Sequence, residues 1–247
     1  MKKKLLFWLG NDYTHLCLSY VLKQKLDCEL YAIVDVSERP KKFFEKQNII
    51  DFKKIWFLHD SIQKQSKKPD FEYLKKFEKK YNINLWKLVL NERIFLYNNF
   101  HNFTYDEILN IVEQVCHFFE SVIDEIKPDF FLTKLPGFHH LEIFYQMCKN
   151  IGIHVLMLNL STFGKSCIIT QNPSKLDDFY EISNKSETNF DELQKQLSEF
   201  DLSNQIKNKV IKPGTDKSSQ FSSALEYFLH SDQKNLETHY NYWKYMF

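Results

Sequence analysis

Residues 127–159 are the stretch of the chain that most restricts its fold. They read KPDFFLTKLPGFHHLEIFYQMCKNIGIHVLMLN. Pro128 is expected to stop the preceding helix, because the residue before a proline avoids helical geometry. Pro136-Gly137 then predicts a turn, and Gly152 predicts the end of the following helix. The predicted elements are a strand at 129–133, a helix at 138–150 and a second strand at 154–158.

A helix that connects two such apolar strands is typical of a parallel pair. Open sheets of parallel strands bind ligands beyond the carboxyl ends of their strands. His139 and His140 begin the connecting helix, so the sequence places both at that edge. The unit therefore predicts an open sheet and a candidate ligand site beside two histidines.

The rest of the amino-terminal part repeats this alternation of strands and helices. Thr104 with Glu107 three residues later is a capping box, and apolar residues keep helical spacing after it. We predict an α/β fold, namely a Rossmann-like, open, mainly parallel sheet flanked by helices, over residues 1–170. Further strands are expected at 5–9, 29–34, 55–58 and 167–170, and further helices ending near residue 25, at 40–47, from 70 to 81, around 86–89 and from 104 to 127.

The composition changes after residue 171. The stretches QNPSKLDD, SNKSETN and KPGTDKSSQFSS are polar and rich in turn residues. Between and after them we expect helices near 191–200 and 222–245. Residues 171–247 thus predict a helical carboxyl-terminal appendage, which ends on aromatic residues. The aromatic tail suggests either that a second domain follows or that the tail packs back on the first domain.

Charge and cysteine content exclude several classes of protein. Lys and Arg number 33 and Asp and Glu 32, so the net charge of +1 argues against a nucleic-acid partner. The five cysteines are widely spaced and predict free thiols, with no metal site and no cofactor. The apolar run at residues 5–9 is too short for a signal peptide. We expect a cytoplasmic protein, with peripheral contact at the inner face of the membrane if its lysine runs share one side.

His139 and His140 are the candidate catalytic residues. A histidine at the start of a helix can donate to a phosphate or a sugar hydroxyl, or accept a proton near neutral pH. Adjacent helical positions point about 100° apart, so at most one of the two is expected to face a given ligand. Capping and packing are the alternative roles of the pair.

Three polar segments are the candidate substrate-binding sites. Gly10, Asn11 and Asp12 follow the first strand, where backbone N–H groups and a helix end favour an anion, although an ordinary capped turn fits as well. Arg93 can clamp a phosphate or carboxylate, or pair internally with Glu92 or another nearby acid. Ser161 and Thr162 follow the last strand of the 127–159 unit, either beside a ligand or in an ordinary polar loop.

One long block and three shorter segments resemble a known family. The block PDFEYLKKFEKKYNINLWKLVLNERIFLYNNF and the later HH, GIHVLMLN and GKSCIIT segments are similar to the amino-terminal half of capsular or surface polysaccharide biosynthesis proteins. These proteins are glycosyltransferase-like, with two facing Rossmann-like domains in the GT-B arrangement. The similarity spans roughly residues 4–170.

The resemblance implies an acceptor-side domain. Its turns at 10–12 and 136–140 would face a cleft between domains, and His139 or His140 would be the base that deprotonates the acceptor hydroxyl. The implied partners are a sugar or glycolipid acceptor and a sugar nucleotide bound by a missing or separate domain. The alternative is a non-catalytic binding or scaffold domain that recruits polysaccharide-assembly partners.

Overall fold

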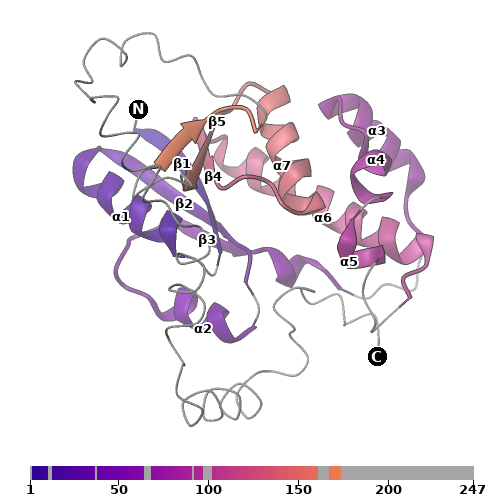
Figure 1. The fold of residues 1–247 in the computed structure, drawn as a ribbon, viewed down its shortest axis with the longest axis horizontal. Helices are drawn as coiled ribbons and strands as arrows, with labels where there is room; N and C mark the ends of the chain where they lie inside the picture. The colour runs from indigo at the N-terminus through magenta and orange to yellow at the C-terminus, as the bar shows by residue number, and fades with distance from the viewer. Residues whose placement is uncertain are drawn as a thin grey trace, which may run out of the picture.

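The computed structural model contains a six-stranded sheet with helices on both faces (Figure 1). It describes residues 2–10, 13–36, 38–63, 68–90, 92–96, 102–160 and 167–173. The strand order is β3-β2-β1-β4-β5-β6, with the first five strands parallel and β6 antiparallel to β5. This confirms the predicted Rossmann-like, mainly parallel sheet. The strands are β1 (Lys3–Leu9), β2 (Cys28–Val34), β3 (Lys54–Phe57), β4 (Phe130–Thr133), β5 (His154–Leu160) and β6 (Cys167–Thr170).

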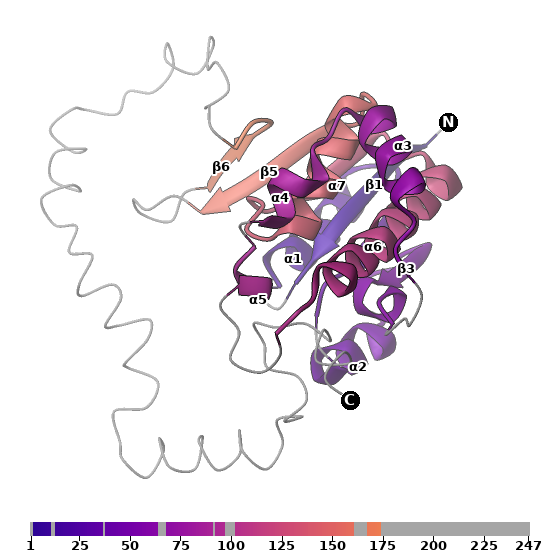
Figure 2. The same cartoon turned by 90° about the vertical axis from the view of Figure 1, so that its right-hand side faces the viewer.

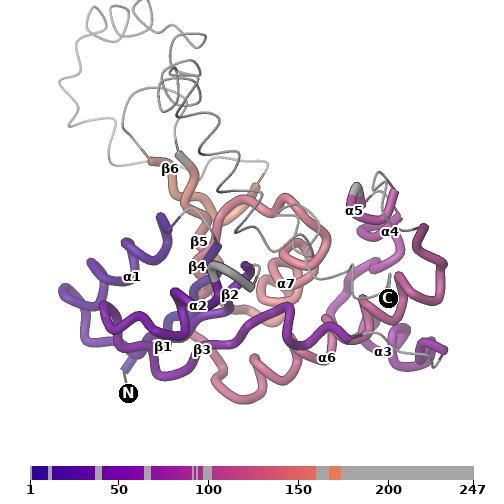
Figure 3. Tube along the Cα trace, turned by 90° about the horizontal axis from the view of Figure 1, so that it is seen from below, coloured from indigo at the N-terminus to yellow at the C-terminus, as the bar shows by residue number. Residues whose placement is uncertain are grey.

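The helices divide between the two faces of the sheet (Figures 1 and 3). On one face, α1 and α2 cover β1 and β2 over a core that includes Phe7, Leu30 and Phe44. On the other face, α6 and α7 pack over a larger core that includes Trp8 and Phe131. The helices α3, α4 and α5 lie beyond α6 and α7, farther from the sheet. The helices are α1 (Thr14–Lys25), α2 (Glu38–Lys46), α3 (Phe71–Tyr81), α4 (Leu85–Leu90), α5 (Arg93–Leu96), α6 (Tyr105–Ile126) and α7 (His139–Asn150), with a short 3₁₀ helix, η1 (Leu58–Ser61).

The capping box predicted at the start of α6 is confirmed. The Thr104 hydroxyl accepts from the Glu107 backbone N–H at 3.3 Å, and the Glu107 carboxylate accepts from the Thr104 N–H at 2.7 Å. The helix keeps its apolar stripe against the sheet down to Ile126. Lys127 then takes a left-handed conformation with φ 46°, and Pro128 follows, so the chain turns into β4.

The unit at 127–159 forms as predicted, with small shifts at its boundaries. Asp129 lies outside β4 because its carboxylate accepts from the Lys4 N–H at 2.9 Å and so closes the amino end of β1. Phe138 is extended and caps α7 instead of joining it. Gly152 has φ 83°, the conformation that ends a helix. Figure 2 shows β5 and β6 side by side at one edge of the sheet.

The order of the strands indicates where a ligand site is expected in a sheet of this kind. β1 pairs with β2 on one side and with β4 on the other, so the chain runs outward in both directions from β1. Loops at the carboxyl ends of β1 and β4 therefore diverge, and open parallel sheets bind ligands at such a point. Gly10 follows β1 and Lys134 follows β4 at this position.

Candidate site at the carboxyl edge of the sheet

Polar side chains that follow three of the strands meet at the carboxyl edge of the sheet. Asp35 directly follows β2, and its backbone N–H donates to the Leu9 carbonyl at 2.8 Å, which joins it to the end of β1. His59 lies in η1 after β3, and His140 lies in the first turn of α7 after β4. The chain thus brings together residues that are 24 and 105 positions apart in sequence.

The Asp35 carboxylate is the centre of this arrangement. His59 Nε2 lies 3.0 Å from one carboxylate oxygen, and His140 Nε2 lies 3.2 Å from the other. The Trp8 indole N–H donates to the second oxygen at 3.3 Å. Because an ionised carboxylate only accepts hydrogen bonds, both histidines present an Nε2–H group to it. We call Trp8, Asp35, His59 and His140 the Asp35 cluster.

Burial and charge act in opposite directions on Asp35. Burial by itself raises the pKa of a carboxyl group, since it disfavours the charged form. The neighbouring His140 and His59 outweigh this effect and hold the pKa of Asp35 below its ordinary value. Asp35 is therefore ionised at neutral pH inside the protein.

Two aromatic rings stack on His140. The Trp8 ring stacks on the imidazole at 5.8 Å between centroids, and the Phe138 ring stacks on it at 5.8 Å as well. The side chain of His140 is fully buried. Its position is therefore fixed by two stacked rings and one charged hydrogen bond.

A second buried pair anchors the start of α7. The Glu92 carboxylate accepts from the His139 backbone N–H at 2.6 Å and lies 3.0 Å from His139 Nδ1. A carboxylate at a helix N-terminus is stabilised by the positive end of the helix dipole. Burial opposes ionisation of Glu92, but its hydrogen bonds to His139 lower its pKa to about 2. Burial also lowers the pKa of His139, and Glu92 offsets this only in part.

Both predicted catalytic histidines lie at this edge, but their side chains are enclosed. His139 and His140 are fully buried at the side chain, and each pairs with a carboxylate of the same chain. The structure thus displays the packing role that the sequence left open, and neither histidine side chain caps α7. A role as catalytic base stays a prediction.

The other predicted binding residues are placed in part. Gly10 lies at the end of β1, as expected. Arg93 begins α5, but its side chain lies outside the described part of the chain. Its neighbour Glu92 pairs with His139. Residues 11, 12, 161 and 162 lie outside the described residues, as do 174–247, which include the expected carboxyl-terminal helices.

Sequence reasoning missed Asp35, His59, Glu92 and Lys134 as members of this edge. Asp35 and His59 each follow a predicted strand closely, and this position was a usable signal. Glu92 had no such signal, because its partner His139 is 47 positions away and the contact depends on how α4 and α5 pack against α7.

A cation lies at the point where β1 and β4 diverge. The Lys134 ammonium is 3.3 Å from the position that a Cβ on Gly10 would occupy. Within the described part of the chain, no carboxylate forms a salt bridge with Lys134. The N-terminus of α1 follows Gly10 closely, and its first turn, all of it described, contains no acidic residue. We call Gly10, Lys134 and the N-terminus of α1 the switch edge.

A shallow pocket of about 270 Å³ lies over the start of α7. Leu88, Glu92, Gly137 and Glu142 are among its lining residues. Thr133 ends β4, and its buried hydroxyl has no hydrogen-bond partner among the described residues. Because side chains alternate along a strand, Thr133 faces the α7 side of the sheet with Phe131.

Within the described residues there is no metal cluster and no membrane-spanning helix, and the chain matches no known family. The described residues contain no cluster of His, Cys, Asp or Glu suited to a metal ion. Among the described helices, none has the length and apolar character needed to cross a bilayer. No protein-family model matches the chain, and a search of curated proteins finds no match either.

Proposed function

We propose that residues 1–170 are the acceptor-side domain of a glycosyltransferase-like protein of capsular or surface polysaccharide biosynthesis. In this proposal the switch edge binds the anionic part of a sugar or glycolipid acceptor. A sugar nucleotide is bound by a separate domain. The observation that carries the proposal is the Lys134 ammonium held beside Gly10 at the point where the strand order reverses.

Three features of the switch edge favour an anion. The absence of a side chain at Gly10 lets a ligand approach the backbone closely. The N-terminus of α1 carries a partial positive charge, which the first turn of the helix does not neutralise. Lys134 adds a full positive charge at the same place. A phosphate or carboxylate on the acceptor matches these groups.

The Asp35 cluster has a positioning role in this proposal. Asp35 connects the segments that follow β2, β3 and β4, and so keeps the edge from changing shape when a ligand binds. If His139 or His140 acts as a base, the segment at 134–138 must first move, because both imidazoles are enclosed.

A non-catalytic binding domain is the second candidate. The burial of both histidines favours it, since a general base must reach the proton that it abstracts. The two candidates share the anion site and differ in whether a chemical step occurs there.

Calorimetric titration of the full chain with inorganic phosphate and glucose 1-phosphate tests the shared site. We expect Lys134→Ala to weaken binding about tenfold or more, because it removes a charge-assisted contact. Lys127→Ala is the matched control, since Lys127 is an exposed lysine at the opposite end of β4.

Two outcomes would contradict the proposal. Equal affinities in the Lys134→Ala and Lys127→Ala variants would remove the switch edge as the anion site. Tight binding of a sugar nucleotide that Lys134→Ala abolishes would contradict the acceptor-side assignment and make this the donor domain.

A further inference from the structure

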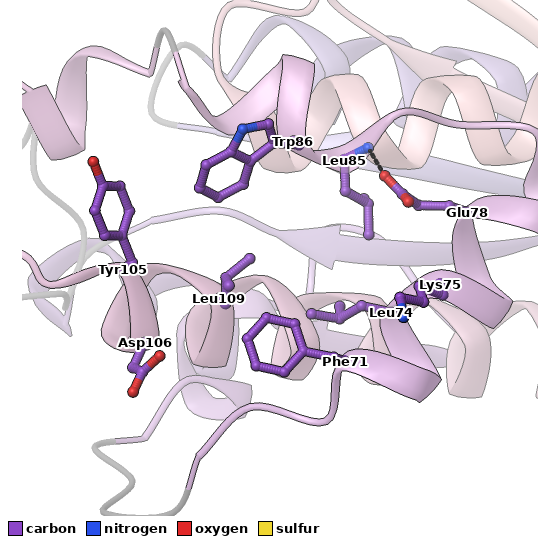
Figure 4. Close-up of a pocket in the computed structure, with 9 residues that line it drawn as sticks. All are labelled: Phe71, Leu74, Lys75, Glu78, Leu85, Trp86, Tyr105, Asp106 and Leu109. Carbon is purple, nitrogen blue, oxygen red and sulfur yellow. Dashed lines mark hydrogen bonds between the residues drawn. The ribbon is translucent and has the colours of Figure 1, made fainter.

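Helices α3 and α4 and the start of α6 enclose an apolar groove of about 410 Å³ (Figure 4). Buried Leu74 and Leu85 lie at its base, and the rings of Phe71, Trp86 and Tyr105 border it. The Trp86 and Tyr105 rings are 6.0 Å apart between centroids. Tyr105 is 70% exposed and Trp86 is 41% exposed, so two large aromatic side chains face solvent here. We call this surface the aromatic groove.

Hydrogen bonds fix the walls of the aromatic groove. The Glu120 carboxylate on α6 accepts from Tyr73 at 2.8 Å and from Tyr81 at 3.0 Å, which ties α3 to α6. Glu78 on α3 accepts from the Leu85 backbone N–H at 2.7 Å, which ties α3 to the start of α4 (Figure 4). The groove is thus formed before anything binds in it, which lowers the entropy cost of binding.

The chain itself supplies a segment that fits such a groove. Residues 236–247 read LETHYNYWKYMF. Leu236, Tyr240, Trp243 and Phe247 are spaced by four, three and four residues. This spacing places apolar anchors on one face of a helix, the pattern of peptides that bind by laying a helix in a hydrophobic groove. Tyr and Trp are also the side chains that most often fill central pockets of interfaces.

A charge at one end of the groove complements a charge of the segment. Lys75 lies at one end of the groove and Asp106 at the other (Figure 4). Glu237 and Lys244 flank the aromatic stripe, and seven helical residues span about 10 Å. Lys244 therefore pairs with Asp106 when the carboxyl-terminal part of the segment lies at the Asp106 end, which places Glu237 toward the other end.

The length of the intervening chain permits this contact. Roughly 60 residues separate the last described residue, Pro173, from Leu236, and even at the 1.5 Å rise per residue of a helix that length of chain extends about 90 Å. A compact domain of about 170 residues is roughly 40 Å across. The segment can therefore reach any part of the surface, at an effective concentration that a free partner rarely attains.

We propose that the segment 236–247 of this chain docks in the aromatic groove, with Tyr240 and Trp243 as its anchors. The chain then covers its own apolar surface, and docking is intramolecular. The proposal is independent of the anion site, since the switch edge and the aromatic groove share no residue.

Hydroxyl-radical footprinting of the full chain tests the proposal, because it reports the exposure of individual aromatic side chains. The comparison is with the full-length variant Tyr240→Ser/Trp243→Ser/Phe247→Ser, in which docking should fall by about 30-fold or more. We expect labelling of Tyr105 and Trp86 to rise several-fold in this variant. Tyr20, an aromatic residue on α1 that is 44% exposed, is the internal control and should not change.

Three results decide the matter. Equal labelling of Tyr105 in both proteins would overturn the proposal, and so would protection that is lost on dilution, which would assign the groove to a second copy. Charge reversal tests the orientation. Asp106→Lys should increase labelling of Tyr105, and adding Lys244→Asp should restore protection; failure to restore it would overturn the orientation proposed here.

Discussion

The carboxyl edge of the sheet and the aromatic groove are built in opposite ways. At the edge, the carboxylates of Asp35 and Glu92 are buried and pair with buried histidines. In the groove, the aromatic rings of Trp86 and Tyr105 are exposed to solvent. The edge therefore contributes to stability through electrostatics, while the groove leaves apolar surface exposed to solvent. Substitutions in the two regions should accordingly differ in their effects on folding.

The largest expected effect is that of Asp35→Ala. The variant leaves the buried N–H groups of Trp8, His59 and His140 without their shared acceptor, which should lower the free energy of unfolding by about 3–5 kcal/mol. Urea unfolding followed by circular dichroism measures this. Asp129→Ala is the control, since Asp129 binds Lys3 and Lys4 at the more exposed amino end of the sheet. An equal loss of unfolding free energy in both variants would show that Asp35 stabilises the fold no more than the more exposed Asp129 does.

The pH dependence of stability should reflect the edge and not the groove. Burial lowers the pKa of His139 below 6.5, so below pH 6.5 the unfolded state binds protons that the folded state does not, and stability falls. The pKa of Glu92 is 4.5 unfolded and about 2 folded. Its contribution is fully present above about pH 4.5 and is lost as pH falls toward 2, with an amplitude on the order of 3 kcal/mol.

The free energy of unfolding measured from pH 8 to pH 2 checks both windows. Below pH 4.5, the free energy of unfolding of Glu92→Gln should fall less steeply than that of the unsubstituted protein. Some decrease should remain, because Asp35 also has a lowered pKa. A Glu92→Gln profile that parallels the unsubstituted protein would contradict the assigned role of this pair.

An intermediate effect is expected for Glu120→Ala, which removes the acceptor of Tyr73, Lys80 and Tyr81 between α3 and α6. Because this network is only partly buried, we expect a loss of about 1–2 kcal/mol in unfolding free energy. Glu125→Ala breaks a well-exposed ion pair with Lys54, and should cost less than about 1 kcal/mol. Guanidinium or urea titration of both variants makes the comparison, and the reverse order would contradict it.

The smallest effect on stability is expected for Lys134→Ala. The side chain forms no ion pair within the described residues, so its removal should change the free energy of unfolding by less than about 0.5 kcal/mol. Thermal denaturation checks this result. A large loss would mean that Lys134 holds the fold together, and would weaken its assignment as a ligand-binding group.

Much of the fold could be predicted because its signals are local. The capping box at Thr104, the glycine at position 152 and the apolar runs before residues 10 and 35 each depend on a few neighbouring residues. The boundaries that shifted, at Asp129 and Phe138, did so because of contacts with other segments. The aromatic groove was not predicted at all, since it requires α3, α4 and α6 to meet.

The sequence by itself determined the alternation of strands and helices and the location of two histidines at the carboxyl edge of the sheet. These follow from local periodicity, which packing then reinforced. Only the tertiary structure decided what surrounds those histidines. His139 and His140 acquired carboxylate partners 47 and 105 positions away, and the resulting burial closes them from solvent. Such pairings arise from the packing of distant elements, which no local pattern of residues encodes.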